Sequence, residues 1–254
     1  MEHSNKAAVL NQGVVIFVFL AVLTALEFFV AIAIGAIALL IVMAIVKVGL
    51  VIYYYMHITK LNEDSGDDHH SLIYKTATNR LGLWLFLLSD SFVFGGLLIS
   101  RFYLLSLTRP PLNQTLGLIV TSVLLLSSFF MNRAEVSMEY GDRKNFIICI
   151  AITFILGLGF VGGVLGVEWP SAIAEGITPA TNTAGAIFFM MTGMHALHVV
   201  TGLIFLGIVL RNGRRGLYTA EKHWAVEAAI IYWHFVDVVW IFFYPALYLI
   251  GKLI

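Results

Sequence analysis

Long apolar runs separated by short polar stretches dominate the chain from residue 14 to its end. A helix needs about 20 mostly apolar residues to cross the hydrocarbon core of a bilayer. Seven runs reach this length, and each predicts a membrane-spanning helix: residues 14–34, 36–58, 81–105, 113–133, 145–167, 184–210 and 226–250. The first two run together, and their division near Gly35 is the least sharply marked boundary. The predicted fold class is all-α, a polytopic membrane helix bundle with seven transmembrane helices.

The distribution of lysine and arginine tests this count. With seven spans, eleven of the 15 basic residues fall on the side of the N-terminus: Lys6, Lys60, Lys75, Arg80, Arg133, Arg143, Lys144, Arg211, Arg214, Arg215 and Lys222. The other side holds three, Arg101, Arg109 and Lys252, and Lys47 lies inside a span. Because cytoplasmic loops are rich in lysine and arginine, we expect a cytoplasmic N-terminus and an outside C-terminus.

Composition agrees with a membrane protein, since 60% of the residues are hydrophobic and 12% are charged. The net charge of zero gives no sign of a nucleic-acid partner, and a single cysteine, Cys149, excludes an internal disulfide. The polar stretch 59–79 separates a two-span part, residues 1–58, from a five-span part, residues 80–254. Its Asp67–His70 run is a candidate metal site, but the residues lack the paired spacing of metal ligands and are more typical of a solvated linker.

Ionisable side chains inside the spans are costly in lipid and usually face the bundle interior. They are Glu27, Lys47, Asp90, His195, His198, His234 and Asp237. At about 1.5 Å of rise per residue, the last five fall in the cytoplasmic half or near the midplane. Three uses remain open for them: hydrogen bonds between helices, haem ligation by the histidines, and a proton relay. We expect a polar layer of His195, His198, His234 and Asp237 near Asp90.

Two further features lie inside the spans. Glu27 and Lys47 have similar depths and opposite charges, which predicts an ion pair across a hairpin, with pairing to another subunit as the alternative. In the fifth span, Gly159 and Gly163 are four residues apart, as are Gly162 and Gly166. This spacing favours a tight helix contact, and a groove for a lipid chain is the functional alternative.

Four segments carry a family resemblance. "LGLWLFLLSDSFVFGGLL" (81–98), "GLGFVGGVLGVEW" (157–169), "GAIFFMMTGMHALHVVTGLI" (185–204) and "EAAIIYWHFVDVVWIFFYPALYLI" (227–250) resemble cytochrome c oxidase subunit III of the haem–copper oxidases. The resemblance covers most of residues 80–252. In the family, the motif of the third span usually ends in serine-glutamate; this chain has Ser89 and Asp90, an acid that is one methylene shorter.

The first part of the chain resembles a different protein. "FLAVLTALEFFVAIAIGAIALLIVMAIVKVGLVIYYYMHITK" (19–60) is similar to the small subunit IV of bacterial oxidases, through Leu23–Glu27, Lys47 and the ending Tyr55, Met56 and His57. The two resemblances together imply a subunit IV–subunit III fusion that is joined at the polar linker.

The subunit III resemblance implies an accessory subunit of a proton-pumping terminal oxidase in the bacterial inner membrane. It implies packing on the catalytic subunit I and assembly with subunit II, which carry the haem and copper, and no cofactor in this chain. It also implies bound phospholipid in a cleft between the first two and the last five helices, and support for proton uptake, for which Asp90 is the candidate acid. Clustered Arg211, Arg214 and Arg215 are candidate contacts for lipid headgroups, although their role can equally be to set topology.

Three alternatives remain open. A quinol oxidase subunit III is close in kind, and this sequence does not choose the electron donor. A standalone proton-coupled transporter predicts inverted repeats with broken helices, and the chain shows neither. A haem-bearing membrane protein is the third, and a visible spectrum separates it from an accessory role.

Overall fold

The structure is a computed structural model, and it describes residues 2–56, 72–180 and 182–253. Within these residues seven helical stretches are long and apolar enough to cross a membrane, which confirms the predicted number. The elements, with η for π-helical turns, are α1 (Glu2–Ala33), α2 (Ile37–Leu50), η1 (Val51–Tyr55), α3 (Leu72–Leu105), β1 (Thr108–Arg109), α4 (Gln114–Glu139), α5 (Arg143–Gly163), η3 (Val164–Glu168), α6 (Trp169–Ala174), α7 (Thr183–Arg215), α8 (Trp224–Tyr244), η4 (Pro245–Leu249) and β2 (Lys252–Leu253).

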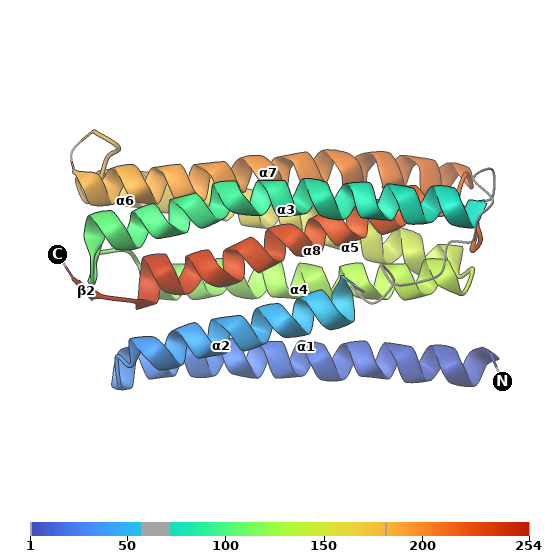
Figure 1. The fold of residues 1–254 in the computed structure, drawn as a ribbon, viewed down its shortest axis with the longest axis horizontal. Helices are drawn as coiled ribbons and strands as arrows, with labels where there is room; N and C mark the ends of the chain where they lie inside the picture. Colours follow the sequence, from blue (N-terminus) through green and yellow to red (C-terminus); the bar gives the residue numbers. More distant parts are fainter. Residues whose placement is uncertain (1, 57–71, 181, 254) are drawn as a thin grey trace.

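The helices run along one axis, with the N-terminus and the C-terminus at opposite ends of the bundle (Figure 1). The end where α1 begins also holds the connections from α4 to α5 and from α7 to α8. The helix ends beside those connections carry Arg143, Lys144, Arg211, Arg214 and Arg215. We therefore call this the basic end and the opposite one the outer end. At the outer end, β1 and β2 form a short parallel pair, in which Thr108 lies opposite Lys252.

The first two spans are separate helices, as the sequence predicts. α1 ends at Ala33 and α2 begins at Ile37. Between them Gly35 has a φ of +64°, a left-handed conformation that glycine adopts without a steric penalty. The chain therefore turns back on itself there and forms a hairpin.

Polar side chains define where three of the later spans begin. Asn113, Asp142 and Asn182 precede α4, α5 and α7, and each accepts a hydrogen bond from a backbone N–H of the first turn. These bonds satisfy amide groups that have no partner within the helix. The C-terminal end of α7 is formed by a glycine: Gly216 takes the left-handed conformation, with a φ of 76°.

Several helices extend beyond the predicted apolar runs. α1 begins at Glu2 instead of residue 14, and α3 begins at Leu72, inside the stretch 59–79 that was predicted to be a linker throughout. The apolar run marks only the part that crosses the hydrocarbon, and a helix continues into water as long as its residues allow it. Asp67–His70, the candidate metal run, and His57 lie outside the described residues.

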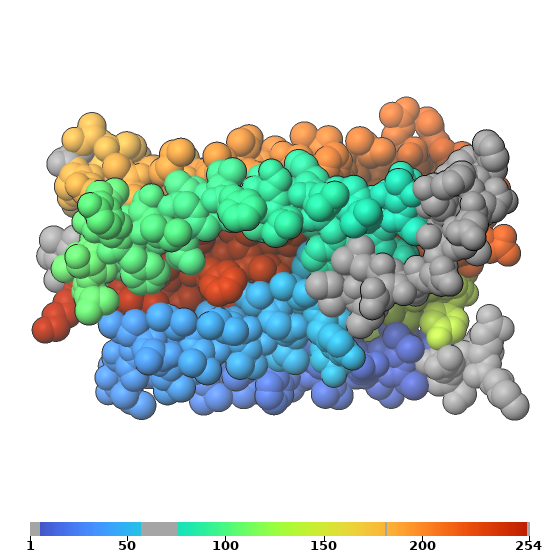
Figure 2. All heavy atoms as spheres, viewed as in Figure 1, coloured from blue at the N-terminus to red at the C-terminus, as the bar shows by residue number. Residues whose placement is uncertain are grey.

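α8 occupies the centre of the bundle and α1 with α2 forms one edge (Figure 1). α1 packs on α4, α4 packs on α5, and α7 packs on both α5 and α8. In the space-filling view, α8 is visible at the bottom of a furrow between α2 and α3 (Figure 2). Part of the α3–α8 seam is a groove of about 180 Å³, whose lining includes Phe94, Gly95, Val239 and Phe243.

In the described part of the chain, three spans contain a π-helical turn, and each turn holds a buried polar side chain. Tyr55 ends η1, Glu168 ends η3, and Tyr248 lies in η4. The three residues are 1%, 4% and 0% exposed. A π-turn adds a residue to the helical repeat and so changes which face a side chain takes, and such turns are frequent at functional sites.

Candidate functional site: buried polar groups between the helices

The Glu27–Lys47 pair lies inside the α1–α2 hairpin. Lys47 Nζ is 2.5 Å from Glu27 Oε2, and the two residues are 1% and 0% exposed. A buried charge that is paired costs much less than a lone one in hydrocarbon. The structure therefore brings these two residues together within the chain, which is the first of the two arrangements considered from the sequence.

Asp90 and His198 meet where α3 packs on α7. Asp90 Oδ2 is 3.1 Å from His198 Nε2, a separation typical of an ion pair, although the orientation is too far out of line for a hydrogen bond. The other ring nitrogen, Nδ1, lies 2.8 Å from the carbonyl of Met194 and donates to it. The two side chains are 16% and 17% exposed, so the pair reaches the surface of the isolated chain.

His234 and Asp237 form a second pair, which is fully buried between α8 and α4. His234 Nδ1 is 2.9 Å from Ser128 Oγ and 3.3 Å from Asp237 Oδ2. The two residues are 0% and 1% exposed. The ring of Tyr55, from η1, stacks against the ring of His234 with 5.1 Å between their centroids.

His195 stands apart from both pairs. Its Nε2 donates to the carbonyl of Val236 at 3.0 Å, and its ring packs between Trp240 and Phe160. Although His195 and His198 are three residues apart, only His198 faces Asp90.

The single polar layer expected from the sequence is thus not present. Among the described residues, no hydrogen bond or ion pair joins His195, His234 or Asp237 to Asp90. Phe94 explains the separation, because its ring packs against His198 on one side and against Phe235 of α8 on the other. The rotation of each helix about its axis places these groups on different faces of the bundle.

Arg211, Arg214 and Arg215 lie exposed in the last turns of α7 at the basic end. Asn212, which follows Arg211, lines an apolar groove of about 500 Å³ between α3, α7 and α8, whose wall includes Phe86, Phe205 and Tyr232. On the α5 side, Arg143 donates to the carbonyls of Gly213 and Arg214 and so fixes the end of α7.

Other buried polar groups were missed from the sequence. Arg101, counted there as an outer loop charge, is 0% exposed and donates to the carbonyls of Ser106, Ala246 and Ile250. Glu168 is buried and accepts a hydrogen bond from Tyr248. The burial of Arg101 could have been predicted from the sequence, because the residue lies within the predicted span 81–105.

The glycine pattern of the fifth span was only partly informative. A Cβ on Gly163 would lie 2.9 Å from Val120, so this residue does allow a close helix approach. A Cβ added to Gly159, Gly162 or Gly166 would meet no other described part of the chain within 4 Å. The closest approach in this helix instead occurs at Gly157, where a Cβ would lie 2.5 Å from the ring of Trp233.

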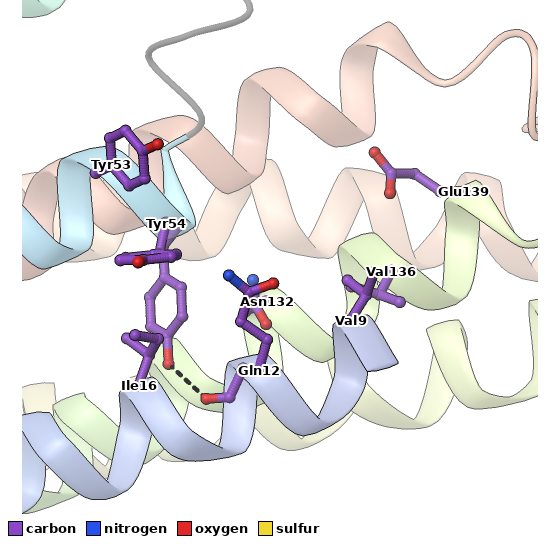
Figure 3. Close-up of a pocket in the computed structure, with 10 residues that line it drawn as sticks. Val9, Gln12, Ile16, Tyr53, Tyr54, Asn132, Val136 and Glu139 are labelled. Carbon is purple, nitrogen blue, oxygen red and sulfur yellow. Dashed lines mark hydrogen bonds between the residues drawn. The ribbon is translucent and has the colours of Figure 1, made fainter. Parts of the chain in front are cut away.

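A pocket of about 350 Å³, lined by both polar and apolar side chains, opens near the basic end between α1, η1 and α4. Figure 3 shows Gln12 and Asn132 turned toward this space, with Tyr53 and Tyr54 on one side and Glu139 on the other. The dashed bond is the one that the Tyr55 hydroxyl donates to the carbonyl of Gly13 at 3.2 Å.

Comparison with known proteins places this arrangement in a family. The family model for cytochrome c oxidase subunit III matches residues 7–252, which includes the two helices likened above to subunit IV. The chain is 37% identical over 179 residues to cytochrome c oxidase subunit 3 of Thermostichus vulcanus, covering 68% of this chain and 87% of that protein.

Two other relatives show the breadth of the similarity. Quinol oxidase subunit 3 of Bacillus subtilis (strain 168) is 33% identical over 198 residues, 74% of this chain and 96% of that protein. Cytochrome c oxidase subunit 3 of Oryctolagus cuniculus is 33% identical over 205 residues, 76% of this chain and 77% of that protein. Since the family model matches all but the first and last few residues, the chain belongs to the cytochrome c oxidase subunit III family.

Proposed function

We propose that this chain is an accessory subunit of a proton-pumping terminal oxidase, which packs on the catalytic subunit I beside subunit II and carries no cofactor of its own. Membership in the subunit III family is the observation that carries the proposal. The packing of the histidines also favours it over haem ligation. His195 and His234 are both 0% exposed and lie against the rings of Trp240 and Tyr55, so a macrocycle has no access to them.

Purification in mild detergent tests this proposal. We expect catalytic oxidase subunits to co-migrate with the chain, and haem and copper to be present in the complex. The isolated chain should show no Soret band. A Soret band from the chain alone, or purification without any haem-containing partner, contradicts an accessory role.

The electron donor is cytochrome c or a quinol. Relatives with both kinds of name match the chain at similar identity, so the similarity favours neither donor. Turnover of the purified complex with reduced cytochrome c, and separately with a quinol, decides between them.

We propose Asp90 as the acid through which this chain supports proton uptake by the catalytic subunit. It holds the family's acidic position and faces His198 at the surface of the bundle, where a neighbouring subunit has access to it. Asp90→Asn keeps the shape and removes titration. We expect normal assembly and haem spectrum, with turnover that falls or decays faster, most visibly at high pH, where protons limit the rate.

Ser89→Ala, one residue away on the exposed side of α3, is the matched control and should behave like the parent. The other possibility is that Asp90 only ties α3 to α7. In that case Asp90→Asn assembles and turns over like the parent at every pH, and the proton role is wrong.

We propose that the basic end faces the cytoplasm of a bacterial inner membrane, from the excess of lysine and arginine in its loops. Reporter fusions at the two termini, read in intact cells, test the orientation. A reporter at the C-terminus that is active only in the cytoplasm contradicts it.

We propose that the complex retains phospholipid, with Arg211, Arg214 and Arg215 near the headgroups. The apolar groove beside Asn212 and the furrow between α2 and α3 support this, because each offers apolar surface for an acyl chain (Figure 2). Neutralising all three arginines should lower the phospholipid that mass spectrometry finds in the purified complex. Neutralising Arg133 and Lys144, at the same end, is the control. Unchanged retention leaves the arginines a role in topology only.

We further propose that residues 1–58 are a subunit IV-like part fused through residues 59–79 to a subunit III-like part, residues 80–254. The relatives cited cover 68–76% of the chain, which leaves room for such an extra part. The hairpin at the edge of the bundle, with its own internal ion pair, fits it as well (Figure 1). Co-expression of the chain cut within residues 59–71 should give two pieces that assemble. If neither piece is stable without a continuous chain, the hairpin is instead an integral part of subunit III.

A further inference from the structure

Amide and phenol groups contribute to the lining of the pocket between α1, η1 and α4. Gln12 and Asn132 turn toward it (Figure 3), and neither side-chain amide makes a hydrogen bond to any other part of the chain that the structure describes. Gln12 is exposed, whereas Asn132 is buried, and a buried amide without a partner is costly. A water molecule takes about 30 Å³ in the liquid, so a pocket of about 350 Å³ has room for several waters.

Tyr55 forms the inner end of this pocket. It lines the pocket, is 1% exposed, and donates its hydroxyl hydrogen bond to the carbonyl of Gly13. A Cβ on Gly13 would lie 2.6 Å from Asn132 Oδ1, so glycine is needed here to keep the amide in place. On its other side, Tyr55 contacts the ring of His234. One aromatic ring thus separates the pocket from the buried His234–Asp237 pair.

The His234–Asp237 pair has two polar atoms without a partner. His234 Nδ1 faces Ser128 and Asp237 Oδ2, but His234 Nε2 and Asp237 Oδ1 are buried without a hydrogen bond. Orphaned buried polar atoms are rare and call for an explanation. Water that entered from the pocket and passed Tyr55 would supply the missing partners.

We propose that this pocket is a water-filled vestibule through which the His234–Asp237 pair exchanges protons with the aqueous phase at the basic end, with Tyr55 as the barrier between them. Among the described residues, the titratable groups in contact with His234 are Asp237 from α8 and Tyr55 from η1, and α4 contributes the hydroxyl of Ser128. Glu135, seven residues beyond Ser128 on α4, is also buried. A hydronium ion in the pocket transfers a proton to His234 Nε2: one of its O–H bonds breaks, an N–H bond forms, and a water molecule is left. Asp237 faces the resulting imidazolium, and the reverse step returns the proton to water.

This site is separate from Asp90, which contacts His198 on α7. The inference therefore goes beyond the proposed function, and either can fail without the other. The test uses the hydrogen on the ring carbon that lies between the two nitrogens of each histidine. Its exchange for deuterium in D₂O is followed by mass spectrometry on the assembled complex. His195 is the internal reference, since it is equally buried but packs against Trp240 and Phe160.

In the parent, His234 should exchange at least about tenfold faster than His195, because its exchange needs no opening of the surrounding helices. Gln12→Leu with Asn132→Leu removes both amides from the lining without touching His234, and should bring the His234 exchange rate down to that of His195. If the double variant does not assemble, Gln12→Leu alone, at an exposed position of α1, makes the same comparison. Equal rates for His234 and His195 in the parent, or a His234 rate unchanged in the variants, overturn the proposal.

Discussion

α3 and α8 are similar in sequence character and opposite in environment. Their most apolar 18-residue windows have mean hydropathies of 1.8 and 1.6, yet 11% of the residues in the α3 window and 83% in the α8 window are buried. In a water-soluble protein, the exposed helix would be much more polar than the buried one. In a membrane the two helices can be equally apolar, because lipid is as apolar as a protein core.

Side-chain size distinguishes the two helices where hydropathy does not. α8 carries large buried rings, and glycines of neighbouring helices receive them: Gly157 and Gly202 contact Trp233. α3 has the reverse pattern, since a Cβ added to Gly82, Gly95 or Gly96 would meet no other part of the chain within 4 Å, and Phe92 is 75% exposed. In the part of α3 whose side chains the structure describes, five residues are buried. Four of them recur every seven positions, at Arg80, Leu87, Phe94 and Arg101, and the fifth is Leu105 at the end of the helix.

The largest effect should come from removing a ring that α8 buries. Trp233 is 0% exposed and donates its indole N–H to Ser127 Oγ at 3.1 Å. Trp233→Ala should destabilise the complex by about 3–5 kcal/mol, as a large buried cavity does. Phe92→Ala on α3 is the matched control and should change stability by less than about 0.5 kcal/mol. Thermal unfolding in detergent measures both, and equal losses would mean that a partner subunit buries α3 as deeply as this chain buries α8.

The second test concerns a buried charge instead of a ring. Lys47→Met leaves Glu27 without its partner and should cost about 3–5 kcal/mol, because an unpaired carboxylate remains in the interior. Glu27→Gln together with Lys47→Met should recover part of this loss. A double-mutant cycle measures the coupling. Strictly additive effects of the two single changes would show that the pair does not contribute as a pair.

A smaller effect is expected from adding a single methyl group. Gly157→Ala places a Cβ 2.5 Å from the Trp233 ring and 2.9 Å from Leu203, so α5 must move away from α8. Such overpacking costs about 1–3 kcal/mol. Gly96→Ala on α3 meets nothing within 4 Å and should be tolerated. The unfolding temperatures of the two variants in detergent measure the difference. If Gly96→Ala is the more destabilising change, a partner helix lies against Gly96.

The smallest effect on stability is expected at the basic end of the bundle, where the charged side chains are surrounded neither by lipid nor by the protein core. Hydrogen bonds from Lys6 and Asn145 lower the pKa of Asp142 from its ordinary value of 3.8 to about 2. A lowered folded-state pKa stabilises the fold above pH 3.8, and this contribution disappears as the pH falls toward 2. Lys6 Nζ lies 2.8 Å from Asp142 Oδ2, a partly exposed pair that typically contributes less than about 1 kcal/mol.

Asp142→Asn should therefore lower the unfolding temperature slightly, by a constant amount from about pH 7 to about pH 5, and by less as the pH falls further. Glu175→Gln, an exposed acid at the outer end, is the control. A difference from the parent that grows as the solution becomes more acidic would contradict the stabilising role of the ionised carboxylate.

The sequence by itself determined the number of spans, the hairpin at Gly35, the opposite charges of Glu27 and Lys47 at similar depth, and the family. These follow from local properties: a run of about 20 apolar residues fits the bilayer, and the helical rise fixes depth. Only the tertiary structure decided that α8 is central, that His198 alone faces Asp90, and that Arg101 and Glu168 are buried. Each of these depends on how a helix is rotated about its own axis and on which neighbour it meets. Hydropathy carries no information about rotation when lipid and protein interior are equally apolar.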